Sequence, residues 1–172
     1  RVSAARRAAA PKFAAAVTKT MQQLGMGGGR FAVDLVATDA PQSFGSETVE
    51  LLVAGHAGAT PRPLAKVASG GELSRISLAI EVAALGLDAV PTMVFDEVDS
   101  GIGGAVAEIV GQKLRALGGS RQALCVTHLP QVAAQGHAHY RVSKAEREGV
   151  AGARGRGRGQ RPPRGRTRRT RH

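Results

Sequence analysis

The chain has 172 residues, enough for one ordinary domain with an apolar core. Its net charge of +11 is uneven, because residues 151–172 hold nine Arg and no acid, whereas residues 1–150 carry 15 Lys and Arg against 13 Asp and Glu. The near-neutral part gives no sign of a basic binding surface, and the absence of a long apolar run or a secretory signal predicts a cytoplasmic protein without a membrane partner.

The first third of the chain predicts a helix followed by two antiparallel strands. Residues 1–10 are rich in Ala and Arg and are interrupted by Pro11, so we expect the apolar residues that follow at helical spacing to form a helix ending before the glycines of residues 25–29. Apolar residues then alternate over residues 31–37 and 49–53, which is typical of paired antiparallel strands. A loop rich in Gly, Ala and Pro follows these strands.

From Ser69 onward the pattern predicts helices and strands in alternation. Ser69 and Glu72 have the spacing of a capping box at the start of the first helix, and Cys125 in a later strand is expected to be a small buried apolar residue. We expect an α/β fold with a mostly parallel sheet covered by helices and the antiparallel pair near its start. The predicted helices cover residues 69–85, 106–117 and 130–134, and the strands cover residues 92–95, 123–126 and 139–142.

The last 22 residues differ from all that precedes them. Residues 151–172 consist almost wholly of Arg, Gly, Pro, Ala and Thr without apolar periodicity, so we expect them to be disordered. Two explanations stand, a slip of reading frame in a GC-rich gene and a nucleic-acid-binding tail. The first residue is Arg1 rather than Met, which predicts a piece of a longer protein.

Polar side chains follow two of the predicted parallel strands, where α/β proteins bind their ligands. Asp96 and Glu97 end the strand over residues 92–95; the first carboxylate suits Mg²⁺ held through water, and the second suits activation of a water molecule. His128 ends the next strand and suits donation to a phosphate oxygen. Taken singly, an acidic pair after a strand is more often a solvated strand end, and a lone histidine is more often a packing or surface residue.

A third motif lies at the start of the helix over residues 69–85. Gly70 and Gly71 allow close approach of the backbone to a ligand, and the helix start offers free N–H groups to an anion. Ser69 adds a hydroxyl group. By itself, this motif is equally well explained as a capped turn.

In combination, the motifs resemble those of ABC-type ATPases. Residues 68–75, 92–97 and 126–128 resemble the signature, Walker B and switch-histidine motifs, in that order. Three segments have sequences that resemble the RecN family, the bacterial SMC-like proteins of double-strand-break repair and recombination. These segments are residues 66–76, 94–104 and 125–133.

The resemblance implies the C-terminal lobe of an ATPase head with the P-loop NTPase fold. Residues 1–24 would be the end of a coiled-coil arm and the helix that enters the head, residues 25–150 the lobe, and residues 151–172 the tail. Its implied cofactors are ATP and Mg²⁺, and its implied partners are a missing N-terminal lobe with Walker A, a second identical head, and DNA at the bacterial nucleoid. The implied site residues are Ser69, Gly70, Gly71 and Glu72 for ATP held in trans, Asp99 in the D-loop, Asp96 for Mg²⁺, and Glu97 and His128 for catalysis.

One departure from the family concerns the grip on the nucleotide. No Lys of the chain is preceded by Gly, so Walker A is absent and we expect the chain to be inactive alone.

Two rival hypotheses remain. A non-enzymatic Arg-rich nucleic-acid-binding protein explains only the tail, and a transporter's nucleotide-binding subunit usually has Gln where Glu72 stands.

Overall fold

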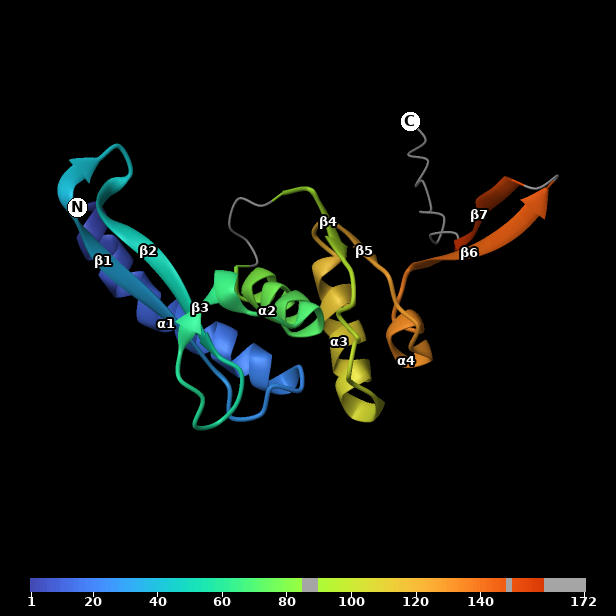
Figure 1. Ribbon diagram of the computed structural model, residues 1–172, viewed down its shortest axis with the longest axis horizontal. Coiled ribbons are helices and arrows are strands. Elements are labelled where there is room, and N and C mark those ends of the chain that lie inside the picture. The colour runs from blue at the N-terminus through green and yellow to red at the C-terminus, as the bar shows by residue number, and fades with distance from the viewer. Residues whose placement is uncertain (85–89, 148–149, 160–172) are drawn as a thin grey trace, which may run out of the picture. The chain divides into compact units, whose positions relative to one another are not determined.

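The computed structural model describes residues 1–84, 90–147 and 150–159 (Figure 1). The chain divides into two compact units, Arg1–Gln135 and Gly136–His172. The first unit contains every residue that the sequence marks as part of a site.

The first unit begins with a long helix, α1 (Val2–Gln23). The prediction of a helix beginning near Pro11 is wrong, because α1 runs continuously through this residue. Proline inside a helix removes one hydrogen bond and costs about 3 kcal/mol. Contacts on both sides of it offset this cost: Val17 and Met21 are fully buried, and Arg6 donates a hydrogen bond of 2.8 Å to the carbonyl of Phe44.

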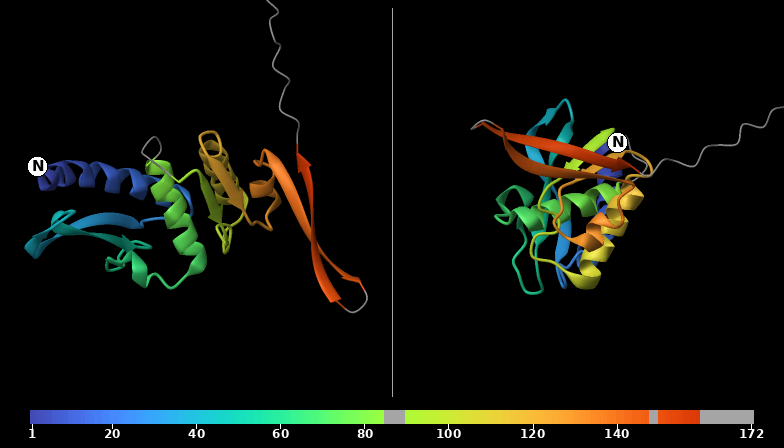
Figure 2. Two further views of the ribbon diagram at one scale, coloured as in Figure 1. Left: turned by 90° about the horizontal axis from the view of Figure 1, so that it is seen from above. Right: turned by 90° about the vertical axis from the view of Figure 1, so that its right-hand side faces the viewer.

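Beside α1 lies an antiparallel sheet (Figure 2). Strands β1 (Arg30–Gln42) and β2 (Gly45–Ala54) pair from Arg30 opposite Ala54 to Ala37 opposite Glu47, which confirms the predicted antiparallel pair. The short β3 (Arg62–Pro63) extends this sheet, and the 3-10 helix η1 (Leu64–Lys66) follows it.

The rest of the first unit alternates helices and strands as predicted. In the described residues the parallel part of the fold is a single pair, in which Phe95 of β4 (Thr92–Phe95) lies opposite Cys125 of β5 (Gln122–Cys125). The expected mostly parallel sheet is therefore not present in the described residues, because the other strands are joined by tight turns or short connections that give antiparallel pairing. The elements are α2 (Gly70–Ala83), β4 (Thr92–Phe95), α3 (Gly104–Leu117), β5 (Gln122–Cys125) and α4 (Pro130–Ala133).

The core of this unit lies between the helices and one face of the β4–β5 pair. Phe95 is buried there, and Met93, Ala123 and Cys125 pack against the buried cluster. The buried apolar residues of the helices are Val17 and Met21 of α1, Ile76, Leu78 and Ala79 of α2, Ala107, Val110, Leu114 and Leu117 of α3, and Val132 of α4.

The second unit is a hairpin of β6 (Ala138–Arg147) and β7 (Val150–Gly159). The predicted strand over residues 139–142 lies in β6. The disorder predicted for residues 151–172 differs from the strand found over Val150–Gly159, and residues 160–172 lie outside the described residues. An antiparallel ladder is made by backbone groups, which Gly and Arg supply without any apolar periodicity. Within the described ranges, no helix is long and apolar enough to cross a membrane.

Two leucines of α2 allow a matched test of this packing. Leu78 is fully buried, whereas Leu73 is 38% exposed. We expect Leu78→Ala to lower the free energy of unfolding by about 2–5 kcal/mol, because it removes buried methyl groups and leaves a cavity. Leu73→Ala, the control in the same helix, should cost less than about 1 kcal/mol. Urea unfolding measures both, and equal losses would contradict this description of the core.

Candidate functional site

The loop that follows β4, residues 96–101, carries two carboxylates and is called the acidic loop below. Asp96 and Glu97 are both exposed, and Oδ1 of Asp96 accepts a hydrogen bond of 2.9 Å from the backbone N–H of Glu97. Glu97 has φ of +56°, which a residue with a Cβ adopts at a cost of about 1–2 kcal/mol. Such conformations cluster at functional sites, so the backbone conformation of Glu97 is consistent with a position in a functional site.

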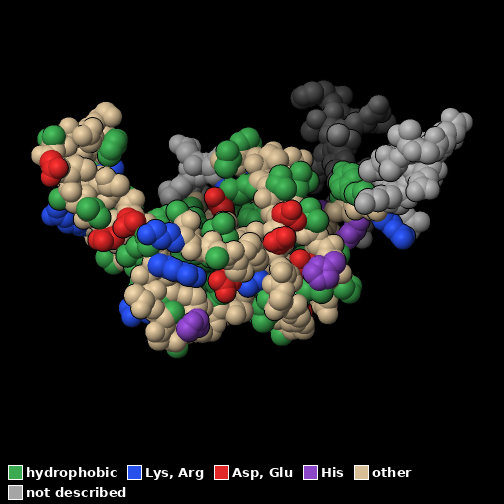
Figure 3. All heavy atoms as spheres, viewed as in Figure 1, with side chains coloured by type: hydrophobic (Ala, Val, Ile, Leu, Met, Phe, Trp, Pro, Cys, Tyr) green, Lys and Arg blue, Asp and Glu red, His purple; other side chains and the backbone are tan. Residues whose placement is uncertain are grey.

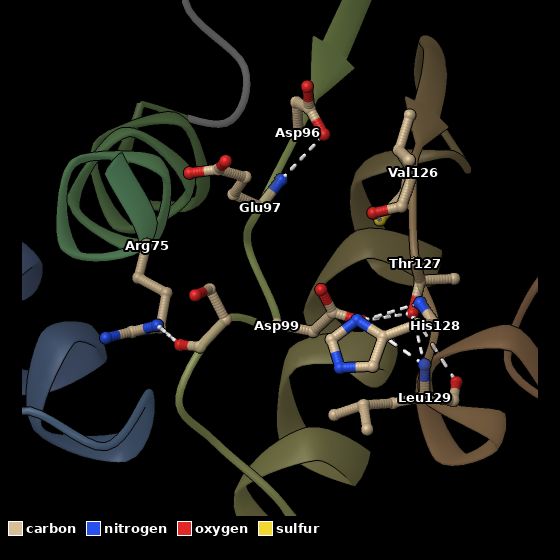
Figure 4. A network of polar contacts seen from close by, with 10 residues as sticks. Arg75, Asp96, Glu97, Asp99, Val126, Thr127, His128 and Leu129 are labelled. Carbon is tan, nitrogen blue, oxygen red and sulfur yellow. Dashed lines mark hydrogen bonds and ion pairs between the residues drawn. The ribbon is translucent and has the colours of Figure 1, made fainter. Parts of the chain in front are cut away.

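The side chain of Asp99 anchors the acidic loop to the segment after β5 (Figure 4). Asp99 is only 2% exposed, and its Oδ2 accepts hydrogen bonds from Oγ1 of Thr127 at 2.5 Å, the N–H of His128 at 3.1 Å and the N–H of Leu129 at 3.3 Å. Burial of Asp99 opposes ionisation, but these hydrogen bonds outweigh it and lower the pKa of the carboxyl group. Asp99 is therefore a buried anion that holds two loops together.

His128 lies beside this anchor. Its Nδ1 is 3.4 Å from Oδ2 of Asp99, while its side chain is 73% exposed. The parallel register of β4 and β5 explains the closeness, because Phe95 and Cys125 end their strands side by side. The two strand ends at which the sequence places polar side chains therefore lie side by side.

The third predicted motif forms the start of α2. Ser69 is the N-cap of α2, and its hydroxyl accepts a hydrogen bond of 3.3 Å from the N–H of Glu72. This is one half of the predicted capping box. Ser69 and Gly70 are exposed, so an anion can approach the helix start from solvent.

The start of α2 adjoins the acidic loop. A Cβ atom added to Gly70 would collide with Oε2 of Glu97, and one added to Gly71 would lie 2.9 Å from Cβ of Ser100. Glycine is therefore needed at Gly71 for this close approach, whereas at Gly70 the contact is with the end of an exposed side chain that can move aside. The acidic loop contacts both of the other motifs, α2 through Glu97 and the His128 segment through Asp99.

Residues of this arrangement that were not among the predicted site residues include Thr127 and Arg75. Thr127 donates to Asp99, and Arg75 donates a hydrogen bond of 2.7 Å to the carbonyl of Ser100. The signal for Arg75 was a cation directly before Ile76 on the apolar stripe of a predicted helix. Thr127 carried no such signal, since a threonine after a strand is common.

The oxygen ligands of the acidic loop suit a hard cation. Asp96 is exposed and offers carboxylate oxygens of the kind Mg²⁺ prefers, with room for the water molecules that Mg²⁺ usually keeps. Figure 3 draws one face of the molecule, and acidic side chains gather near the centre of this face. No group of three or more His, Cys, Asp and Glu side chains lies together in the described residues, so no cage made of protein groups alone occurs there.

Known proteins with similar sequences share one description. No protein-family model matches the chain. The chain is 59% identical over 152 residues to the DNA repair protein RecN of Xylella fastidiosa strain Temecula1, 46% over 144 residues to RecN of Haemophilus influenzae, and 48% over 142 residues to RecN of Streptomyces coelicolor. These matches cover 87%, 83% and 76% of the chain. The chain is of the RecN type.

The RecN-type chain spans 27%, 26% and 25% of the lengths of these three relatives. Solved structures show its fold to be that of an SMC head domain. The head domain of Smc from Pyrococcus furiosus matches 83% of the chain with a TM-score of 0.59 and 22% identity, and the head from Pyrococcus yayanosii matches 82% with a TM-score of 0.57 and 21% identity. These matches cover 34% and 26% of those two chains.

The buried carboxylate of Asp99 predicts a dependence of stability on pH. Its pKa lies below the usual 3.8 in the folded chain, so its stabilisation is present above that value and is lost as the pH falls through the folded pKa. We expect Asp99→Asn to be less stable than the wild type near neutral pH, and the difference to shrink below about pH 4. Urea unfolding across a pH series measures it.

The control for this experiment is Asp39→Asn, which changes an exposed residue of β1. This variant should track the wild type at every pH. A difference between Asp99→Asn and the wild type that stayed constant down to acid pH would contradict the role of the Asp99 anion.

Proposed function

We propose that the chain forms the C-terminal lobe of a RecN-type ATPase head that acts in DNA double-strand-break repair and recombination. One observation carries the proposal: the acidic loop contacts both the start of α2, where Glu97 lies against Gly70, and the His128 segment, which is bonded to Asp99. Three motifs suited to phosphate chemistry thus gather around one loop. The RecN relatives favour this function over a transporter subunit.

The exposed start of α2 would bind the terminal phosphate of ATP. Ser69 supplies a hydroxyl group, and Gly70 and Gly71 supply backbone N–H groups without a Cβ that would block the approach. The N–H of Glu72 donates to the hydroxyl of Ser69, which caps the helix. The positive end of the helix dipole adds to the attraction for the phosphate.

The acidic loop and the His128 segment would act on the reacting groups. Glu97 is the general base that orients and deprotonates the attacking water. His128 donates to a phosphate oxygen as charge builds up. Asp96 would hold Mg²⁺ through water, and the bound ion supplies neutralisation of phosphate charge. Asp99, as the D-loop residue, holds the loop in place.

The proposed site needs groups from a further lobe and from a second head. The sequence contains no Walker A, whose backbone cradle and Lys hold the β- and γ-phosphates. We therefore propose that an N-terminal lobe supplies Walker A and that the start of α2 contacts ATP held by a second identical head. ATP binding then joins two heads and hydrolysis releases them, which would gate DNA at the nucleoid in the bacterial cytoplasm.

The role of Glu97 is tested in a head completed by the N-terminal lobe of a RecN relative. Glu97→Gln should lower the turnover of ATP by about 10²–10⁴, because it removes the base, while ATP-dependent pairing of heads persists. Phosphate release measures turnover and light scattering measures pairing. Glu108→Gln, at an exposed residue of α3, is the control, and wild-type turnover in Glu97→Gln would exclude Glu97 as the base.

The start of α2 is tested by crowding it. Ser69→Arg should abolish the ATP-dependent pairing of completed heads, because the long side chain fills the place of the partner's terminal phosphate. Affinity for ATP should persist, since Walker A holds the nucleotide. Ser43→Arg adds the same charge in the exposed β1–β2 turn and should pair normally. Pairing by both variants would show that α2 does not meet the nucleotide.

A further inference from the structure

One face of α2 grips the acidic loop. Gly71, Ser74 and Arg75 lie three and four residues apart, so they share this face. Gly71 packs against Ser100, where a Cβ would lie 2.9 Å from that side chain. The hydroxyl of Ser74 donates to the carbonyl of Asp96, and Nη1 of Arg75 donates to the carbonyl of Ser100 at 2.7 Å. The helix thus holds the loop near both of its ends.

Of the residues on this face, Arg75 is the least favourable for the free energy of folding. It is only 7% exposed, and its Nε is buried without a hydrogen-bond partner in the described part of the chain. Burial lowers the pKa of its guanidinium group, an effect that the nearby charge of Glu72 opposes. A buried, incompletely paired cation is unfavourable for folding, and a leucine would pack there at less cost. Core packing therefore does not account for an arginine at this position.

The position of the bound carbonyl points to what Arg75 does. Ser100 directly follows Asp99, whose side chain accepts hydrogen bonds from Thr127 and from the N–H groups of His128 and Leu129. Two adjacent residues thus carry the contacts to α2 and to the His128 segment (Figure 4). Hydrogen bonds therefore run from α2 through Arg75 to the acidic loop, and from Asp99 of that loop to His128.

We propose that Arg75 is a positioning residue that fixes the acidic loop relative to the start of α2. Its catalytic consequence rests on the proposed function. There, the start of α2 serves the nucleotide of the partner head, while Glu97 and His128 serve the nucleotide of their own head. Arg75 sets the distance between these two half-sites, so that binding of a nucleotide at one half-site changes the position of the residues at the other.

The structural part of the proposal is tested on the 172-residue chain by hydrogen exchange. The reporters are the N–H of Ser100, bonded to the carbonyl of Glu97 at 3.0 Å, and the N–H of His128, bonded to Asp99. Arg75→Met should raise the exchange rate of both by about tenfold, the effect of losing one charge-assisted hydrogen bond. Arg75→Lys, which keeps a cationic donor, should restore part of the protection and serves as the test if Arg75→Met does not fold.

The matched control is Arg121, another arginine with a buried side chain. Its side chain is 6% exposed and pairs with Glu81 at 3.1 Å, away from the acidic loop. Arg121→Met should leave the two reporters unchanged relative to the rest of the chain. If Arg75→Met and Arg121→Met changed the reporters equally, the role of Arg75 would be general stability and the proposal would be overturned.

The catalytic part is tested in the completed head by separating kcat from KM. Arg75→Met should lower kcat for ATP by about tenfold with KM unchanged, because it displaces the acidic loop and not the nucleotide, and Arg75→Lys should lower kcat less. Wild-type kcat in a variant with fast-exchanging reporters would overturn the link from loop position to hydrolysis. A completed wild-type head without turnover would instead overturn the proposed function, and the exchange data would still decide whether Arg75 positions the loop.

Discussion

The buried carboxylate of Asp99 is the interaction on which the candidate site depends. A carboxylate that is 2% exposed is tolerated only when its charge is met by hydrogen bonds, and Asp99 obtains three from residues 127–129. These bonds join the loop after β4 to the segment after β5, beyond the four paired positions of the two short strands. Together with the parallel register of β4 and β5, this group holds the acidic loop and the His128 segment beside each other.

The elements were predictable where the pattern is local. Strand β4 has the predicted bounds, and α3 differs from the prediction by only two residues at its start, because apolar spacing and flanking glycines determine them. Pro11 was misleading because the contacts that keep α1 intact, such as Arg6 to the carbonyl of Phe44, join residues far apart in the sequence. The tail was misjudged over Val150–Gly159, where backbone pairing needs no apolar pattern.

The candidate site was predictable to a similar extent and for the same reason. Motif spacing placed Ser69, Asp96 and His128 at the ends of the correct elements. The contacts that join these ends were not visible, since Arg75 meets Ser100 across 25 residues and Thr127 meets Asp99 across 28 residues. Contacts between the ends of parallel strands always join residues far apart in the sequence, because a crossover connection lies between the two strands. A single sequence therefore indicates the parts of such a site better than its connections.

These long separations also bear on the order in which the molecule acquires its structure. The β1–β2 hairpin closes over a tight turn after Gln42, and α1 forms within one segment, so both can appear early. The acidic loop is fixed only after α3 has brought β5 beside β4, since closing long loops is entropically costly and slow. The half of the molecule nearest α1 is therefore expected to mature first, with the chemical groups assembled in the last stage of folding. Sequence changes in α3 would then affect the yield of competent protein without touching any group of the site.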